Sequence, residues 1–160
     1  MKLSTQEEYG LRCLLQMARR GDASLTLADL ARHEGVSQPN VAKIMRILRK
    51  AGFVLSTRGQ AGGYTLARPA AEINVGDVLA AMGGRLYDAS FCESHAGANL
   101  SCTHSGDCSI RPVLMQVQIA IDQVLGKLTL GQLLCSEGEM RSRTGPRAIN
   151  LPLAESRSIS

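Results

Sequence analysis

The segment LTLADLARHEGVSQPNVAKIMRILRKAGFV constrains the fold more than any other part of this 160-residue chain. Its apolar spacing predicts a short amphipathic helix over 28–34, a turn at Gly35, and a longer helix that Ser37 caps and that runs to about Ala51. Two helices joined by a tight glycine turn are typical of a helix-turn-helix motif, although an ordinary helical hairpin shows the same pattern.

The residues that follow this helix pair favour the first interpretation. Strand-like runs at 53–57 and 64–67 flank a glycine-rich turn that carries Arg58 and Gln60, which predicts a β-hairpin. The order of two helices and a basic hairpin is that of a winged helix, in which the second helix of the motif enters the DNA major groove. We therefore expect a mainly α-helical fold with a small β-hairpin wing.

A predicted DNA-binding surface follows from the polar side of the second helix and from the wing. Apolar Val41, Ile44 and Leu48 would face the core, and amide and cationic side chains would face outward; the alternative is a solvated helix face. A net charge of +4 and an aromatic content of 3% favour a duplex polyanion over stacking on single-stranded bases. The residues predicted to contact DNA are Gln38, Pro39, Asn40, Lys43, Arg46, Lys50, Arg58 and Gln60.

A long apolar helix is predicted after residue 109. Two series of apolar residues repeat every seven positions and form one seam. The series are Ile110, Val117 and Val124, and Leu114, Ile121 and Leu128. Such a seam can pack on its own domain, but beside a DNA-binding module it suits a two-fold homodimer that reads a palindromic operator in double-stranded DNA.

The patterns divide the chain into four parts. Residues 1–84 form a winged helix-turn-helix DNA-binding domain, 85–109 a cysteine-rich loop, 110–135 a dimerisation helix with a short closing helix, and 136–160 a disordered tail. The N-terminus turns acidic where a signal peptide would be apolar, and no run is long enough to span a bilayer, so we expect a cytoplasmic protein. No nucleophile and base are paired at a recognisable motif spacing, which argues against an enzyme.

The cysteine-rich loop contains FCESHAGANLSCTHSGDCSI, with three of the five cysteines and two of the three histidines. Cytoplasmic cysteines are normally reduced, so this clustering indicates metal or redox chemistry. Nine and five residues separate Cys92, Cys102 and Cys108, wider than the paired-cysteine knuckles of structural zinc. Spacing alone leaves an iron–sulfur cluster, zinc and no metal as alternatives. A first helix is predicted from the possible N-cap Ser4 or Thr5 to Gly21, and Cys13 is expected to be buried packing within it, whereas Cys135 is unassigned.

Six segments resemble, in order over about residues 1–135, the Rrf family of winged-helix regulators, to which IscR and NsrR belong. They are MKLSTQEEYGLRCLLQMA, VSQPNVAKIMRILRKAGFV, RGQAGGYTLARP, INVGDVLAAMGG, the three-cysteine loop and TLGQLL. The resemblance implies a dimeric transcriptional regulator whose cysteine loop holds a [2Fe–2S] or [4Fe–4S] cluster and which senses cluster supply, redox state, nitric oxide or iron. The wording of the loop is most similar to members associated with control of Suf-type cluster assembly.

The resemblance also bears on the fourth ligand, because three thiolates leave one position open. Members similar to IscR place a histidine three positions after the last cysteine, where this chain has Arg111. Other branches use a carboxylate in the first helix or a histidine in the helix-turn-helix of the partner subunit. The matching positions are Glu8 and His33, and the loop alternatives are His95 and His104.

Two other functions use the same residues. A winged-helix DNA-binding protein stabilised by zinc would need the helices without a redox response, and an iron–sulfur carrier or assembly protein would need the cysteines without the basic winged helix.

Overall fold

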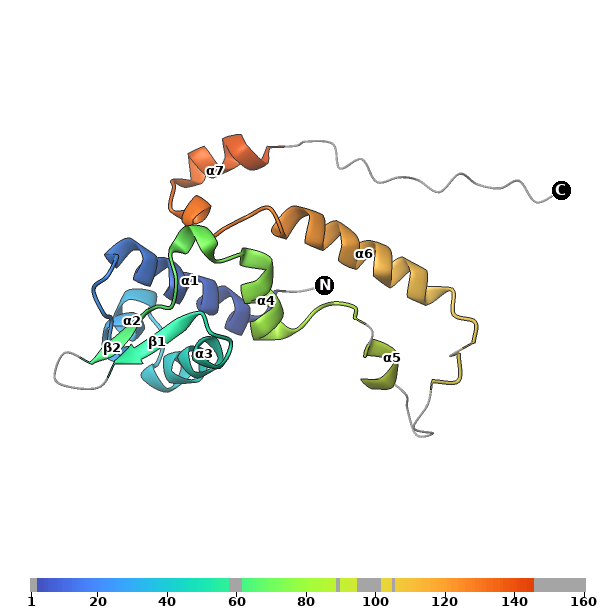
Figure 1. The fold of residues 1–160 in the computed structure, drawn as a ribbon, viewed down its shortest axis with the longest axis horizontal. Helices are drawn as coiled ribbons and strands as arrows, with labels where there is room; N and C mark the ends of the chain where they lie inside the picture. Colours follow the sequence, from blue (N-terminus) through green and yellow to red (C-terminus); the bar gives the residue numbers. More distant parts are fainter. Residues whose placement is uncertain (1–2, 58–61, 89, 95–101, 105, 146–160) are drawn as a thin grey trace.

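The computed structural model describes residues 3–57, 62–88, 90–94, 102–104 and 106–145. Its described part is mostly helical and contains one two-stranded antiparallel hairpin, so the predicted fold class is confirmed. A winged-helix body holds the N-terminal half, and one long helix projects from it (Figure 1).

The first two helices are each set by a capping box and a glycine. Helix α1 (Thr5–Arg20) begins after Ser4, whose side chain accepts from the Glu7 backbone N–H, and ends at Gly21. Helix α2 (Leu27–Glu34) ends at Gly35, whose φ of 65° lies in the left-handed region that favours glycine. Helix α3 (Gln38–Lys50) begins three residues later, which completes the predicted helix-turn-helix.

The wing pairs β1 (Val54–Thr57) with β2 (Gly63–Leu66). Leu25 extends this hairpin, because its backbone exchanges hydrogen bonds of 3.0 and 2.8 Å with Tyr64. A Cβ at Gly63 would lie 2.8 Å from the Leu25 carbonyl oxygen, so this close approach requires glycine. Arg49 of α3 donates a 3.2 Å hydrogen bond to the Ser56 hydroxyl, which braces the wing against α3.

One apolar core lies between α1, α2, α3, the hairpin and α4 (Val75–Gly83), with the short 3-10 turn η1 (Ala70–Glu72) at its edge. Leu14, Leu30 and Leu48 are fully buried in it. Leu130 belongs to the same core although it follows α6 in sequence. The body therefore includes a segment from far along the chain.

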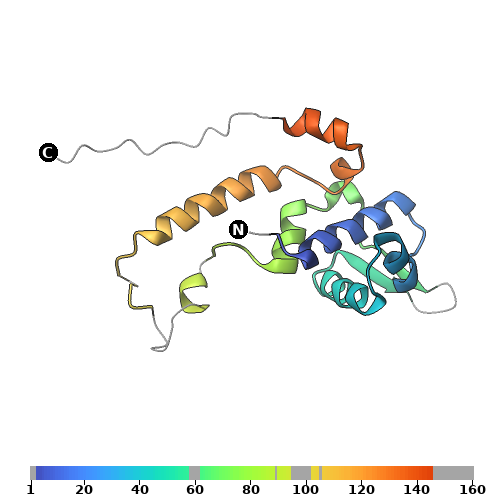
Figure 2. The same ribbon diagram turned by 180° about the vertical axis from the view of Figure 1, so that it is seen from behind.

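Beyond α4 the chain forms α5 (Phe91–Ser94), α6 (Ile110–Leu125) and the 3-10 turn η3 (Gly131–Leu133). The C-terminal end of α6 is held to the body because Val75 donates to the Leu128 carbonyl at 2.9 Å and Leu130 to that of Ile73 at 2.8 Å. The other end of α6 and α5 lie away from the body, as both views show (Figures 1 and 2).

The stretch 136–160 differs from the expected disordered tail in its first part. Residues Glu137–Thr144 form α7, which Ser136 and Glu139 cap and which an Arg141–Glu137 ion pair of 2.6 Å supports. The helix has no apolar stripe, so periodicity could not reveal it; its capping box was the available signal. Residues 146–160 lie outside the described residues. No described helix is both long and apolar enough to cross a membrane.

Candidate functional site

Helix α3 presents the polar face that the sequence predicts. Val41, Ile44 and Leu48 face the core, and Met45 is buried with them. All six predicted DNA contacts on this helix are exposed: Gln38, Pro39, Asn40, Lys43, Arg46 and Lys50. Their role at DNA stays a prediction, and Arg58 and Gln60 of the wing lie outside the described residues.

The loop cysteines carry free, half-buried thiols. Cys92 lies on α5, and Cys108 lies two residues before α6. In the described part of the chain, no three cysteine, histidine or acidic side chains come together as a metal-binding group. His104 is exposed, and His95 is outside the described residues.

Tyr87 shows where two of these thiols lie. The pKa of Tyr87 is raised mainly by desolvation and further by its interactions with Cys92 and Cys108, against the opposing charge of Arg111. The Tyr87 ring also packs on Phe91 with centroids 5.4 Å apart. Cys92 and Cys108 therefore both lie within electrostatic range of the Tyr87 hydroxyl, near the N-terminal end of α6.

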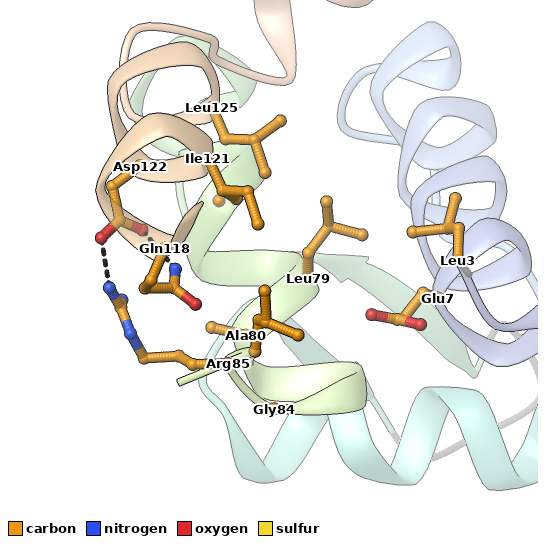
Figure 3. Close-up of a pocket in the computed structure, with 12 residues that line it drawn as sticks. Leu3, Glu7, Leu79, Ala80, Gly84, Arg85, Gln118, Ile121, Asp122 and Leu125 are labelled. Atoms are coloured by element: carbon orange, nitrogen blue, oxygen red, sulfur yellow. Dashed lines mark hydrogen bonds and ion pairs between the residues drawn. The ribbon is translucent and has the colours of Figure 1, made fainter. Parts of the chain in front are cut away.

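A polar bridge joins the start of the cysteine loop to α6. Gln118 accepts a 3.2 Å hydrogen bond from the Tyr87 backbone N–H and donates one of 2.9 Å to Asp122. Asp122 in turn pairs with Arg85, as the dashed lines in Figure 3 show. These groups border a pocket of about 140 Å³ between α1, α4 and α6. Sequence reasoning missed the bridge; its signal was a glutamine inside an apolar helical run.

The two alternative fourth ligands lie on the winged-helix body. Glu8 is exposed on α1 and pairs with Arg12 at 3.4 Å. Arg12 also donates through Nε to the buried Glu34 carboxylate of α2 at 2.5 Å. These charges raise the pKa of Arg12, with the Glu34 hydrogen bond as the largest cause. One arginine thus joins Glu8 to the first helix of the helix-turn-helix.

His33 lies at the C-terminal end of α2, with its Nε2 at 3.5 Å from Arg20 Nη2. Neither His33 nor Glu8 belongs to a metal-binding group within the described part of a single chain. Cys13 is fully buried, and burial raises its pKa to about 12, as expected for a packing residue rather than a ligand.

Helix α6 divides the predicted seam between two environments. Leu114 and Ile121, with Leu128 just after the helix, are half-buried, whereas Ile110, Val117 and Val124 are exposed. Of the nine large apolar side chains exposed in the described residues, six lie on α6. Within the described residues, nothing covers this exposed stripe.

Comparisons with known proteins identify the family. The Rrf2 family, described as iron-dependent transcriptional regulators, matches residues 3–136. This chain belongs to the Rrf2 family. It is 35% identical to protein rrf2 of Nitratidesulfovibrio vulgaris over 84% of this chain and 87% of that protein. It is 33% identical to the HTH-type transcriptional regulator IscR of Vibrio atlanticus over 84% of this chain and 75% of that one.

Solved structures of Rrf2 relatives share the fold. T. potens IscR has a TM-score of 0.65 at 28% identity and covers 92% of this chain and 93% of its own. CymR, the global cysteine regulator of B. subtilis, has a TM-score of 0.65 at 26% identity and covers 84% of this chain and 96% of its own. These relatives are transcriptional regulators and not enzymes, as predicted for this chain.

Proposed function

We propose that this Rrf2 regulator binds operator DNA under the control of an iron–sulfur cluster held by Cys92, Cys102 and Cys108. The observation that carries the proposal is that three free, half-buried thiols lie in one segment before α6, two of them within electrostatic range of Tyr87. Soft thiolates select iron–sulfur clusters or zinc over hard cations. A bound cluster, [2Fe–2S] or [4Fe–4S], would supply a redox-sensitive and labile centre.

The exposed stripe of α6 supports a homodimer. Ile110, Val117 and Val124 would pack against the same residues of a second copy, since a two-fold interface uses one patch twice. A dimer would also present two copies of α3 to the two halves of a palindromic operator.

Glu8 of the partner subunit is the proposed fourth ligand. Its carboxylate is exposed, and Arg111 occupies the position of the histidine used by members similar to IscR. Arg12 links Glu8 to buried Glu34 on α2, so a shift of the Glu8 side chain is passed to the helix-turn-helix. Such a ligand would tie one subunit's loop to the other subunit's DNA-binding domain, and differential stability of two arrangements would then control DNA affinity.

Anaerobic purification followed by a visible spectrum and iron, sulfide and zinc assays tests the cofactor. Alanine at Cys92, Cys102 or Cys108 should abolish the chromophore, whereas Cys135→Ala, a half-buried cysteine outside the loop, should keep it. Stoichiometric zinc with no sulfide would instead show a zinc-stabilised module. An intact chromophore in any one loop variant would remove that cysteine from the site.

The fourth ligand is tested by comparing Glu8→Ala with His33→Ala. Glu8→Ala should give a cluster that is lost more readily and should reduce the difference in DNA affinity between cluster-bound and cluster-free protein. Glu8→Cys should keep the cluster, because a softer donor replaces a harder one. Loss of the cluster in the His33 variant alone would assign the position to His33 instead.

The DNA surface is tested with Lys43→Ala and Arg46→Ala. Each should weaken operator binding by about 1–3 kcal/mol if it contacts a base, or lower the salt slope by about one if it contacts a phosphate. Arg143→Ala on α7 removes an exposed cation away from α3 and is the matched control. If both the Lys43 and the Arg46 variant bind DNA with unchanged affinity and salt slope, the DNA-binding surface does not include this face of α3.

A further inference from the structure

Gln118 is unusual in its surroundings. Among the described residues it is one of two buried polar or charged side chains, with 7% of its surface exposed, and it lies in the middle of a helix rich in apolar residues. A buried amide is costly unless its hydrogen bonds are made. Both ends of this amide are used: the oxygen by the Tyr87 backbone and the nitrogen by Asp122.

The partners of Gln118 form a two-rung bridge. One rung is the Tyr87–Gln118 hydrogen bond, and the other is the Arg85–Asp122 ion pair. The Gln118–Asp122 hydrogen bond joins the two rungs on α6, where the residues are four apart and share a face. The bridge therefore fixes the chain at residues 85–87 to the middle of α6, and Figure 3 shows its Arg85, Gln118 and Asp122 side chains.

The bridge lies directly before the first loop cysteine. Tyr87 packs on Phe91, and Cys92 is the next residue after Phe91. At the other end of the loop, Cys108 lies two residues before α6 begins. Helix α6 therefore positions both cysteines: Cys92 through the bridge, and Cys108 because it directly precedes the helix in the chain.

From this geometry we infer that Gln118 is a positioning residue that sets the approach of Cys92 to Cys108. It acts through Tyr87 and touches no ligand atom. The effect of Gln118 on cluster binding rests on the proposed function. Its effect on how readily the Cys92 and Cys108 thiols meet does not, and is measured in metal-free protein.

The test measures the effective concentration of the Cys92–Cys108 pair in metal-free protein equilibrated with glutathione. In this exchange one Cys92–Cys108 disulfide forms while one oxidised glutathione is reduced to two glutathione molecules. Mass spectrometry measures the fraction of the protein that carries the disulfide, and this fraction gives the effective concentration of the two thiols. Cys102 and Cys135 are replaced by serine, and Cys13 stays because it is buried. Gln118→Leu keeps the bulk and removes both hydrogen bonds. Gln116→Leu makes the same change at an exposed position of α6 and is the control.

Gln118→Leu should lower the effective concentration by about tenfold, the effect of losing one buried hydrogen bond on an equilibrium constant, while Gln116→Leu leaves it unchanged. An equal value in both variants, or a parent value no higher than that of Gln118→Leu, overturns the inference. If Gln118→Leu does not fold, Gln118→Asn decides, because it keeps an amide that is too short to hold both Tyr87 and Asp122: an unchanged value with this variant also overturns the inference.

Iron–sulfur reconstitution of the full-cysteine protein is measured separately. If the protein with all its cysteines and Gln118 forms no chromophore, the proposed function is wrong, and the result of the thiol measurement still stands. With a chromophore present, Gln118→Leu should lose it faster than Gln116→Leu on exposure to a chelator, and equal rates of loss would overturn the positioning role at the cluster.

Discussion

The winged-helix body and the arm, which runs from α5 to the end of α6 (residues 91–125), differ in how far their side chains are buried and paired. In the body, α1 and α2 begin with capping boxes, apolar side chains are buried, and buried Glu34 has Arg12 as its partner. In the arm, apolar side chains of α6 are exposed, and the loop thiols are free. The body is complete as a single chain, whereas the arm presents groups that suit a second chain and a metal.

This difference indicates where regulation acts. A packed core resists small changes, because its contacts support one another. If the exposed stripe and the thiols of the arm bind the proposed partners, the arm can change state when a partner binds or leaves, at little cost to the body. We expect variants of the arm to alter assembly and sensing, and variants of the body to alter folding.

The largest expected effect is on assembly. Val117→Asp places a charge in the exposed stripe of α6 and occurs twice in a two-fold dimer. Burial of one such side chain contributes about 1.5–3 kcal/mol, so the dimer should dissociate at micromolar concentration while the monomer stays folded. Sedimentation and circular dichroism check this, and Gln123→Asp, exposed on the same helix, is the control. A dimer unchanged by Val117→Asp would contradict the proposed interface.

Leu130 breaks a simple division between the two regions, because it follows α6 but is buried in the body. Leu130→Ala should lower the free energy of unfolding by about 2–5 kcal/mol, as for other fully buried leucines. Leu134→Ala, 40% exposed four residues later, should change it by no more than about 0.5 kcal/mol. Urea denaturation of both variants measures the difference, and equal midpoints would contradict the assignment of Leu130 to the core of the body.

Much of the body could be predicted from the sequence because local signals agree there. Ser4, Gly21 and Gly35 mark helix ends, and Val41, Ile44 and Leu48 recur at helical spacing. The return of Leu128–Leu130 to residues 73–75 could not be predicted, because it depends on backbone pairing between distant segments and not on periodicity.

The sequence predicts which residues make up the candidate site but not how they are arranged in space. Cys92, Cys102 and Cys108 stood out by their clustering. The contacts of Tyr87 and Gln118 with the loop were not predictable, because each joins residues that share no local pattern. Fourth-ligand geometry depends on a second chain, which one sequence does not place; Glu8 therefore stays a prediction.

A smaller effect tests the charge pair that completes the body. Arg12→Met leaves the buried Glu34 carboxylate without its arginine and should cost about 1–3 kcal/mol of unfolding free energy. Adding Glu34→Leu should recover part of this loss, because the pair is coupled. Arg32→Met breaks an exposed pair with Asp29 and should cost less than about 1 kcal/mol. Chemical denaturation that finds Arg12→Met and Arg32→Met alike would contradict the assigned role of Arg12.

The smallest effect compares the buried thiol of the body with the free thiols of the arm. Burial raises the pKa of Cys13 from 9.0 to about 12, so the folded state keeps this proton at a pH where the unfolded chain releases it. The stability that this contributes is therefore present below pH 9 and is lost as the pH rises toward 12. Cys13→Ala should flatten that alkaline decline, measured by urea midpoints between about pH 8 and 10.5. Iodoacetamide should modify Cys92 and Cys108 in the native protein and spare Cys13, since the two loop thiols are half-buried and Cys13 is fully buried. Alkylation of Cys13 at the rate of the loop cysteines, with no change of the alkaline slope in Cys13→Ala, would show that the body opens as readily as the arm.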